Sequence, residues 1–148
     1  MATGRDDPYA QFSFLLQLEG VTIAGFSEVI GLSAEIDVVE YREGNESNHG
    51  VAELRKLVGL MKYTNIVCKH GFAADASLWR WIRSADAGGA QRQSGSIVLL
   101  DEGRNKVLSW SFHDGWPVKW DGQELNAETN EVAIEMLEIA HEGFALDP

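Results

Sequence analysis

The stretch NEVAIEMLEIAHEGF, from Asn130 to Phe144, decides the fold because its residues suit two different structures. Ala, Glu, Met and Leu are good helix formers, so residue choice alone favours a helix. A helix would, however, carry apolar and glutamate side chains around its whole circumference instead of along one stripe. A strand would carry apolar side chains on both faces: Val132, Ile134 and Met136 on one, Leu137 and Ile139 on the other. Such a strand suits a domain that covers its core with one side and meets a neighbouring subunit with the other. Periodicity alone leaves helix and strand open.

Several other stretches alternate apolar and polar residues with the period of two that is typical of a half-buried strand. Strands are predicted within residues 11–20, 32–41 and 61–71, and two more within 94–116, joined by a short hairpin connection at Asp101 to Asn105. The segment AGFSEVIGL, residues 24–32, contains two glycines and is interpreted as a turn or bend. The sequence therefore predicts a mainly β domain.

One helix is predicted at about residues 75–86, in DASLWRWIRSADAGG. Asp75 or Ser77 can cap its start, and two glycines end the pattern. Its apolar face carries Leu78, Trp81 and Ile82, whereas Trp79 lies off that face. Trp79 therefore either packs under a loop or meets another chain.

Residues 42–60 show no sustained period and are rich in Gly, Asn, Ser and charge. A long irregular stretch in a compact domain is either a flexible surface loop or a functional one. We interpret residues 42–61 as a long interaction loop within a single domain that spans residues 1–148.

The composition limits the possible functions. A net charge of −11, from 23 acidic and 12 basic residues, argues against tight binding of nucleic acid. No apolar run is long enough for a membrane-spanning helix, and the N-terminus does not resemble a signal peptide, so we expect a soluble product made in the cytoplasm. The single cysteine, Cys68, is interpreted as a small apolar strand residue.

Catalytic motifs are absent from the sequence. It contains no GxSxG, GxxxxGK[ST], GxGxxG or HExxH pattern, and its four histidines lack the spacing of metal ligands. We therefore expect no enzyme, cofactor or metal site. Five tryptophans favour an assembly protein, because aromatic residues are enriched where protein surfaces meet.

Eight segments between Asp7 and Phe144 form a pattern that extends along nearly the whole chain. They are DPYAQFSFLLQLEG, AGFSEVIGL, EYREGN, RKLVGLMKYTNI, LWRWI, SIVLLDEG, GWPVKW and LNAETNEVAIEMLEIAHEGF. In order and spacing, these segments resemble the tail tube proteins of contractile phages and of phage-tail-like injection systems. Two departures occur: the family often has proline where Val58 stands and arginine where His70 stands.

This resemblance implies a fold and an assembly. The fold is a two-sheet antiparallel β-barrel or sandwich with one α-helix packed on its side, related to the tube protein of type VI secretion. The subunits form hexameric rings, and the rings stack into a rigid inner tube. The resemblance also implies that residues 130–144 are the last strand.

The resemblance further implies surfaces and partners. The partners are copies of the chain, the tail sheath, baseplate or tube-initiator and tail terminator proteins, and a tape-measure protein, DNA or effector cargo in the lumen, within a virion tail or injection particle. Alternatives are a baseplate tube initiator and, from another class, a small ligand-binding β-barrel. Arg80 and Arg83 are expected to face the sheath, and the residues expected at contacts between subunits or rings are Tyr41, Arg42, Glu43, Arg55, Lys56, Leu57, Tyr63, Glu131 and Glu135.

Overall fold

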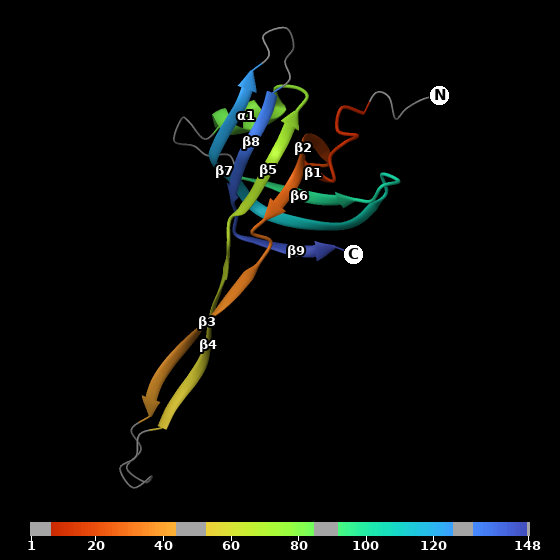
Figure 1. Ribbon diagram of the computed structural model, residues 1–148. Coiled ribbons are helices and arrows are strands. Elements are labelled where there is room, and N and C mark those ends of the chain that lie inside the picture. The colour runs from red at the N-terminus through yellow and green to blue at the C-terminus, as the bar shows by residue number, and fades with distance from the viewer. Residues whose placement is uncertain (1–6, 44–52, 85–91, 126–131, 148) are drawn as a thin grey trace. The chain divides into compact units, whose positions relative to one another are not determined.

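The computed structural model describes residues 7–43, 53–84, 92–125 and 132–147 (Figure 1). The described residues are mainly β, with one short helix, as the sequence predicts. They belong to two compact units: residues 33–64 form one, and residues 1–32 with 65–148 form the other. In chain order the elements are β1 Phe14–Leu18, β2 Val21–Ile30, β3 Ala34–Glu43, β4 Glu53–Tyr63, β5 Ile66–Ala73, α1 Ser77–Ser84, β6 Gln93–Leu100, β7 Lys106–Leu125, β8 Val132–Ala140 and β9 Gly143–Asp147.

The larger unit is a closed antiparallel β-barrel. Its strands are hydrogen-bonded in the order β6-β1-β2-β5-β8-β7, and β7 pairs back with β6, which closes six strands into a ring. A seventh strand, β9, pairs with β7. Because the ring is closed, each of its six strands has a hydrogen-bonded neighbour on both sides within the same chain.

The long strand β7 explains how the closing stretch folds. Its first half pairs with β6 and β9, and from Trp116 onward it pairs with β8. Strands β8 and β9 thus pair with different parts of β7, and His141 and Glu142 connect β8 to β9. The strand interpretation of this stretch is confirmed, but the last strand is β9, which begins at Gly143.

Apolar residues at both even and odd positions of β8 lie in the core of a single chain. Ile134, Leu137 and Ile139 are all fully buried in the same core cluster. The expectation that one face meets a neighbouring subunit is therefore wrong for these residues. The reason is a register shift against β7, where Asp121 and Gly122 pair with Met136 and Ile134, so one extra β8 residue changes which side chains point inward.

The helix α1 packs on the side of the barrel against β2 and β7. Leu78 and Trp81 are its buried residues. Of the two predicted caps, Asp75 performs the role, since its Oδ1 accepts a hydrogen bond of 2.8 Å from the Ser77 N–H. This hydrogen bond lowers the pKa of Asp75. The described helix ends at Ser84, short of the predicted residue 86, and residues 85–86 lie outside the described residues. No helix among the described residues is long and apolar enough to cross a membrane.

Strand β2 corrects one prediction. Residues 24–30, expected in a turn or bend, are strand. Gly25 is there for packing, because an added Cβ would lie 3.0 Å from Phe12 Cβ and 3.0 Å from Tyr9 Cδ1. Gly31 does end the strand: its φ of +88° suits glycine, and a Cβ would lie 2.0 Å from the Asn65 carbonyl oxygen.

The smaller unit is the antiparallel hairpin of β3 and β4. The sequence predicts an irregular stretch at residues 42–60. This prediction is wrong from Glu53 onward, where β4 begins, and residues 44–52 lie outside the described residues. A register shift hides the period: Ile36 pairs with Met61 and Val38 with Val58, so β4 carries an extra residue. The single strand predicted at 61–71 is two strands, with Thr64 and Asn65 between them.

Candidate interaction surfaces

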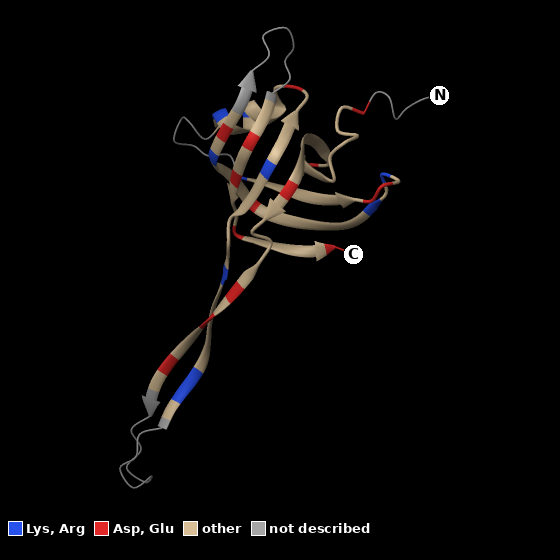
Figure 2. Cartoon of the chain, viewed as in Figure 1, with Lys and Arg blue, Asp and Glu red and all other residues tan. Residues whose placement is uncertain are grey.

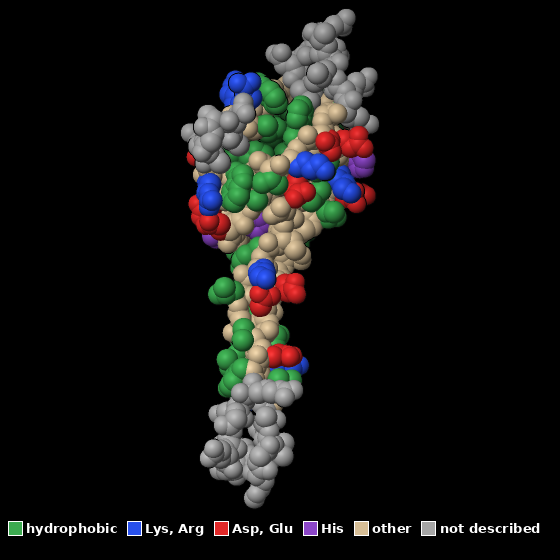
Figure 3. Space-filling model, turned by 90° about the vertical axis from the view of Figure 1, so that its left-hand side faces the viewer, with side chains coloured by type: hydrophobic (Ala, Val, Ile, Leu, Met, Phe, Trp, Pro, Cys, Tyr) green, Lys and Arg blue, Asp and Glu red, His purple; other side chains and the backbone are tan. Residues whose placement is uncertain are grey.

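The hairpin exposes most of the large apolar side chains that lie on the surface of the described residues. Nine of the fifteen such side chains belong to it, and Val58 and Leu60 are 85% and 80% exposed. Figure 3 shows hydrophobic side chains along this unit. Large exposed apolar patches are typical of sites where proteins meet. The nine are Ile36, Val38, Val39, Tyr41, Leu54, Leu57, Val58, Leu60 and Met61.

Both faces of the hairpin carry these apolar residues. Directly paired residues of an antiparallel sheet share a face, and successive residues of a strand alternate between faces. A two-stranded sheet has no layer of its own to cover either face. From the observed register, one face carries Ile36, Val38, Val58 and Met61, and the other carries Val39, Tyr41, Leu57 and Arg55.

The hairpin also carries opposite charges across its two strands. Lys62 Nζ lies 2.8 Å from Asp37 Oδ2, and this contact raises the pKa of Lys62. Glu40 pairs directly with Lys56 further along the hairpin. Figure 2 shows the acidic positions on β3 beside the basic positions on β4. Opposite charges across a pair support the register of a strand pair.

The structure brings together part of the predicted contact set. Tyr41 pairs with Arg55, and Lys56 and Leu57 follow along β4. Tyr63 lies at the other end of β4, paired with Ala34. The remaining predicted residues are elsewhere: Arg42 and Glu43 belong to β3 but their side chains lie outside the described part, Glu131 lies outside the described residues, and Glu135 is exposed on β8.

The two predicted sheath-facing arginines are exposed on α1. The guanidinium of Arg83 lies 6.0 Å from the centre of the Trp79 ring, and Trp79 packs against Trp120 with ring centres 5.4 Å apart. Trp79 remains 45% exposed. Trp and Arg are the residues most enriched at the energetic centres of protein interfaces, so this helix offers a second candidate surface.

A polar cluster occupies the junction of β7, β8 and β9. His113 Nδ1 lies 3.2 Å from Asp114 Oδ2, which lowers the pKa of Asp114. Glu142 forms an ion pair with Arg92, whose guanidinium lies 4.4 Å from the centre of the Trp116 ring. Ligand atoms of His113, Asp114 and Glu142 lie within 4.8 Å of one another, which the sequence spacing did not predict. The ion pair joins Glu142, in the connection between β8 and β9, to Arg92, which directly precedes β6.

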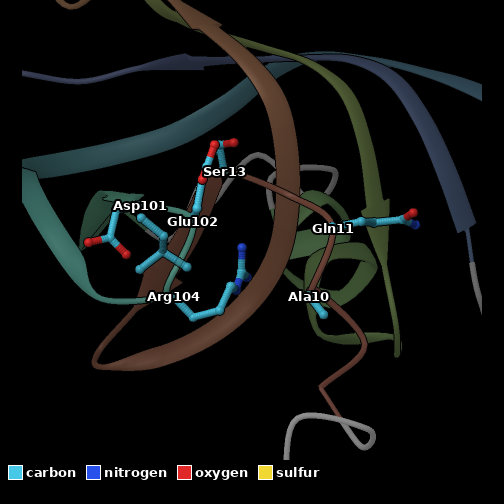
Figure 4. A pocket seen from close by; sticks show the side chains of 7 residues that line it. Ala10, Gln11, Ser13, Asp101, Glu102 and Arg104 are labelled. Carbon is cyan, nitrogen blue, oxygen red and sulfur yellow. The ribbon is translucent and has the colours of Figure 1, made fainter.

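A shallow hollow of about 470 Å³ lies where the segment before β1 meets the turn between β6 and β7 (Figure 4). Its lining mixes acidic, basic and small polar side chains, without a converging set of catalytic groups among the described residues. The residues are Ala10, Gln11, Ser13, Leu100, Asp101, Glu102 and Arg104.

Residues 10–145 match the family model described as T4-like virus tail tube protein gp19. The chain belongs to this tail tube protein family. The match covers almost the whole chain and confirms the resemblance inferred from the motifs. Members of this family are structural proteins of tails and not enzymes, and the chain is thus a component of a phage tail or contractile injection particle. No curated protein sequence matches significantly.

Solved structures share the fold. A chain of the PVC sheath–tube complex, an extracellular contractile injection system in its extended state, gives a TM-score of 0.68 at 20% identity, covering 97% of this tail tube protein and 94% of that chain. A chain of the anti-feeding prophage tube-terminating cap gives 0.66 at 20% identity, covering 99% of both chains. A chain of the anti-feeding prophage baseplate gives 0.64 at 22% identity, covering 96% and 97%.

The exposed apolar residues of the hairpin are the main feature that sequence reasoning missed. A signal was present, because adjacent apolar pairs such as Val38 with Val39 and Leu57 with Val58 place apolar groups on both faces of a strand. The alternation predicts a strand within residues 32–41, but residues 42–60, which include Leu57 and Val58, show no sustained period. A strand with both faces apolar and no covering layer predicts contacts with other chains.

Proposed function

We propose that this tail tube protein assembles with copies of itself into hexameric rings, which stack into the rigid inner tube of a contractile tail or injection system. The observation that carries the proposal is the β3–β4 hairpin, whose apolar side chains are exposed on both faces in a member of the tail tube family. The barrel is complete within one chain, whereas the hairpin is not. Other copies of the chain are the partner that a tube requires.

The hairpin supplies contacts between copies through both of its faces. Obligate interfaces commonly bury more than about 2,000 Å² in total and are rich in apolar side chains. Tyr41, Arg55, Lys56 and Leu57 lie within this surface and are proposed to contact an adjacent subunit or ring. Arg42, Glu43, Tyr63, Glu131 and Glu135 stay proposed contact residues of the same kind.

The negative charge suits a conduit. Six copies at −11 each would carry −66 formal charges per ring. Acidic groups that face the lumen would repel DNA or acidic effector proteins and keep such cargo mobile. Lysines introduced on lumen strands would slow the passage of nucleic acid.

A sheath is the proposed outer partner, because one structural relative is a chain of a sheath–tube complex. The surface of α1 that carries Arg80, Arg83 and Trp79 is the proposed contact. The sheath would contract around the tube and drive it through a target envelope, so the tube needs strong contacts within itself and weaker ones to the sheath. Assembly would take place in the bacterial cytoplasm.

A second candidate is a protein that forms a single ring at one end of the tube. It is favoured by the nearly equal similarity to chains of the tube-terminating cap and of the baseplate, with TM-scores of 0.66 and 0.64 against 0.68 for the sheath–tube complex. Such a protein would initiate or end the tube and would not polymerise.

Electron microscopy of the purified full-length protein tests these candidates. Tubes of stacked rings are expected from the first proposal, and single rings that do not stack would favour the second. A protein that stays monomeric at every concentration would overturn both. As a control, a variant with Val58→Glu and Leu57→Glu in the hairpin should keep the barrel folded and form no tubes.

A further inference from the structure

Residues 7–13, which we name the N-terminal strap, pack on the outside of two barrel strands. Tyr9 is 7% exposed, and its ring meets Phe72 of β5 edge-on with centres 6.0 Å apart. Phe12 lies parallel to Phe72, with centres 6.1 Å apart and an angle of 5°. Both strap side chains also touch the position of Gly25 on β2. The strap thus covers an aromatic and glycine-lined part of the barrel wall.

Arg104, from the turn between β6 and β7, holds this strap through two backbone carbonyls. Its Nη1 donates to the Phe12 carbonyl at 2.6 Å, and its Nη2 donates to the Tyr9 carbonyl at 2.7 Å. Nη2 also lies 3.8 Å from Asp7 Oδ2. Figure 4 shows Arg104 between the strap residue Ala10 and the turn residue Asp101. A planar guanidinium can reach two acceptors at once, which a lysine ammonium on its flexible stem does not reproduce.

The backbone of the turn gives independent support. Arg104 has a φ of +64°, in the left-handed region that disfavours residues with a Cβ. The turn is already held without the side chain, since the Asn105 N–H donates to Asp101 Oδ1 at 2.8 Å and the Arg104 N–H donates to the Asp101 carbonyl at 3.0 Å. Glycine would fit this backbone at lower cost. The arginine therefore serves the strap and not the turn.

The strap has few other attachments to the barrel. The Tyr9 hydroxyl accepts a hydrogen bond from the Ala74 N–H at 3.2 Å, and the Leu100 N–H donates to the Ser13 carbonyl at 2.8 Å. Other hydrogen bonds of the strap are local, such as the one that the Phe12 N–H donates to the Tyr9 carbonyl at 3.0 Å. A segment with few bonds to its support can open without global unfolding.

We propose that the N-terminal strap opens and closes independently of the barrel and that Arg104 is the positioning residue that keeps it closed. When the strap opens, it uncovers the rings of Phe12 and Phe72 beside Gly25. The strap therefore controls an apolar surface of the barrel unit that is separate from the hairpin surface used in the proposed assembly.

Hydrogen exchange followed by mass spectrometry on the full chain tests this proposal. The variants are Arg104→Gly, which suits the left-handed backbone but lacks the guanidinium, and Arg104→Lys, which keeps one charge. Arg92→Met is the matched control, because it removes an arginine with ion-pair and ring contacts on another part of the barrel. We expect exchange in peptides covering residues 9–13, and at Ala74, to become at least about tenfold faster in both Arg104 variants, whereas β5, β6 and β8 keep their protection.

Three kinds of result would overturn the proposal. Unchanged exchange of the strap in Arg104→Gly, or full protection in Arg104→Lys, would show that the guanidinium does not hold the strap. Equal acceleration across the strap and all barrel strands would show that the strap is part of the global unfolding unit. Faster strap exchange in Arg92→Met would remove the specificity of Arg104. The readout does not require tubes, so failure of the assembly proposal leaves it intact.

Discussion

The barrel unit and the hairpin unit differ in how much of their apolar side chains they bury. In the barrel, Leu137 and Phe26 are fully buried by strands of the same chain. In the hairpin, Val58 is 85% exposed although it has the same chemical character. The closed ring pairs its strand edges internally, whereas β3 and β4 pair only with each other. One chain therefore combines a unit that buries its own apolar side chains with a unit that leaves most of its large apolar side chains exposed.

This difference separates two kinds of mutational effect. A change in the barrel core acts on the free energy of unfolding of a single chain. If the hairpin joins copies as proposed, a change on it acts on the free energy of association, because the free hairpin already exposes these side chains to water. Measurements on dispersed subunits and on assembled protein can therefore distinguish the two units.

The largest expected effect is the loss of a core side chain. Leu137→Ala should lower the free energy of unfolding of the dispersed subunit by about 3 kcal/mol, because it removes buried methyl groups and leaves a cavity. Val58→Ala should change the same quantity by less than about 0.5 kcal/mol, because this side chain is exposed. Urea denaturation of both variants provides the measurement. Equal losses would contradict the division into two kinds of unit.

The second effect concerns association. Val58→Glu should raise the protein concentration needed for assembly at least about a hundredfold, equivalent to about 2.7 kcal/mol, because a carboxylate would be buried without a partner. Val58→Leu is the matched control and should assemble like the wild type. Sedimentation of assembled material against protein concentration gives the values. Normal assembly of the glutamate variant would show that this part of the hairpin stays exposed.

The third effect is an alkaline loss of stability that comes from the barrel alone. Burial raises the pKa of the Cys68 thiol to about 12. The unfolded thiol ionises near pH 8.5, so the unfolded state loses its proton first as the pH rises. The contribution of the Cys68 thiol to the free energy of unfolding is therefore complete below about pH 8.5. Above that pH it falls by about 1.4 kcal/mol per pH unit until about pH 12.

The measurement for Cys68 is the difference in unfolding free energy between wild type and Cys68→Ala at pH 8, 9 and 10. The wild type should lose more stability than the variant over this range. A thiol reagent at pH 8 should modify Cys68 only as fast as the protein unfolds. Rapid modification of the folded protein would contradict the buried position.

The smallest effect concerns the cap of α1. Asp75→Ala should destabilise the barrel unit by about 1 kcal/mol, whereas Asp75→Asn, which keeps an oxygen acceptor for the Ser77 N–H, should cost less. Because the folded pKa of Asp75 is lowered, its contribution is complete above about pH 3.9 and is lost as the pH falls through the folded pKa. Thermal unfolding at pH 7 and pH 3 measures both. No difference between wild type and Asp75→Ala at pH 7 would rule out the capping role.

Much of the barrel follows from local patterns in the sequence. Alternation at Phe14, Leu16 and Leu18 gives β1, and the turn residues Asp101 to Asn105 mark the β6–β7 connection. The helix was located from one apolar face and a capping aspartate. These features depend only on neighbours within a few residues, so a single sequence contains them.

The remaining features depend on contacts that a single sequence does not display. Gly25 resembles a turn residue, yet it lies within β2. A glycine is needed at this position because Tyr9 and Phe12 occupy the space that a side chain would fill. The extra residue in β4 shifts the alternation, so the strand appears irregular. For the candidate surface, the sequence located Tyr41, Arg55 and Leu57 through the family resemblance, but the extent of the apolar surface needed the register of the two strands.

The point at which the hairpin enters the chain has a consequence for how such proteins can diversify. It is inserted between β2 and β5, which pair directly up to Ile30 with Val67. The barrel would therefore keep its hydrogen bonding if the insertion were lengthened, shortened or exchanged for that of a relative. Gly31 and Asn65 mark the junction, where the backbones approach too closely for any side chain at position 31. If the hairpin joins copies as proposed, recombination at this junction would change which copies recognise one another and would leave the barrel unchanged.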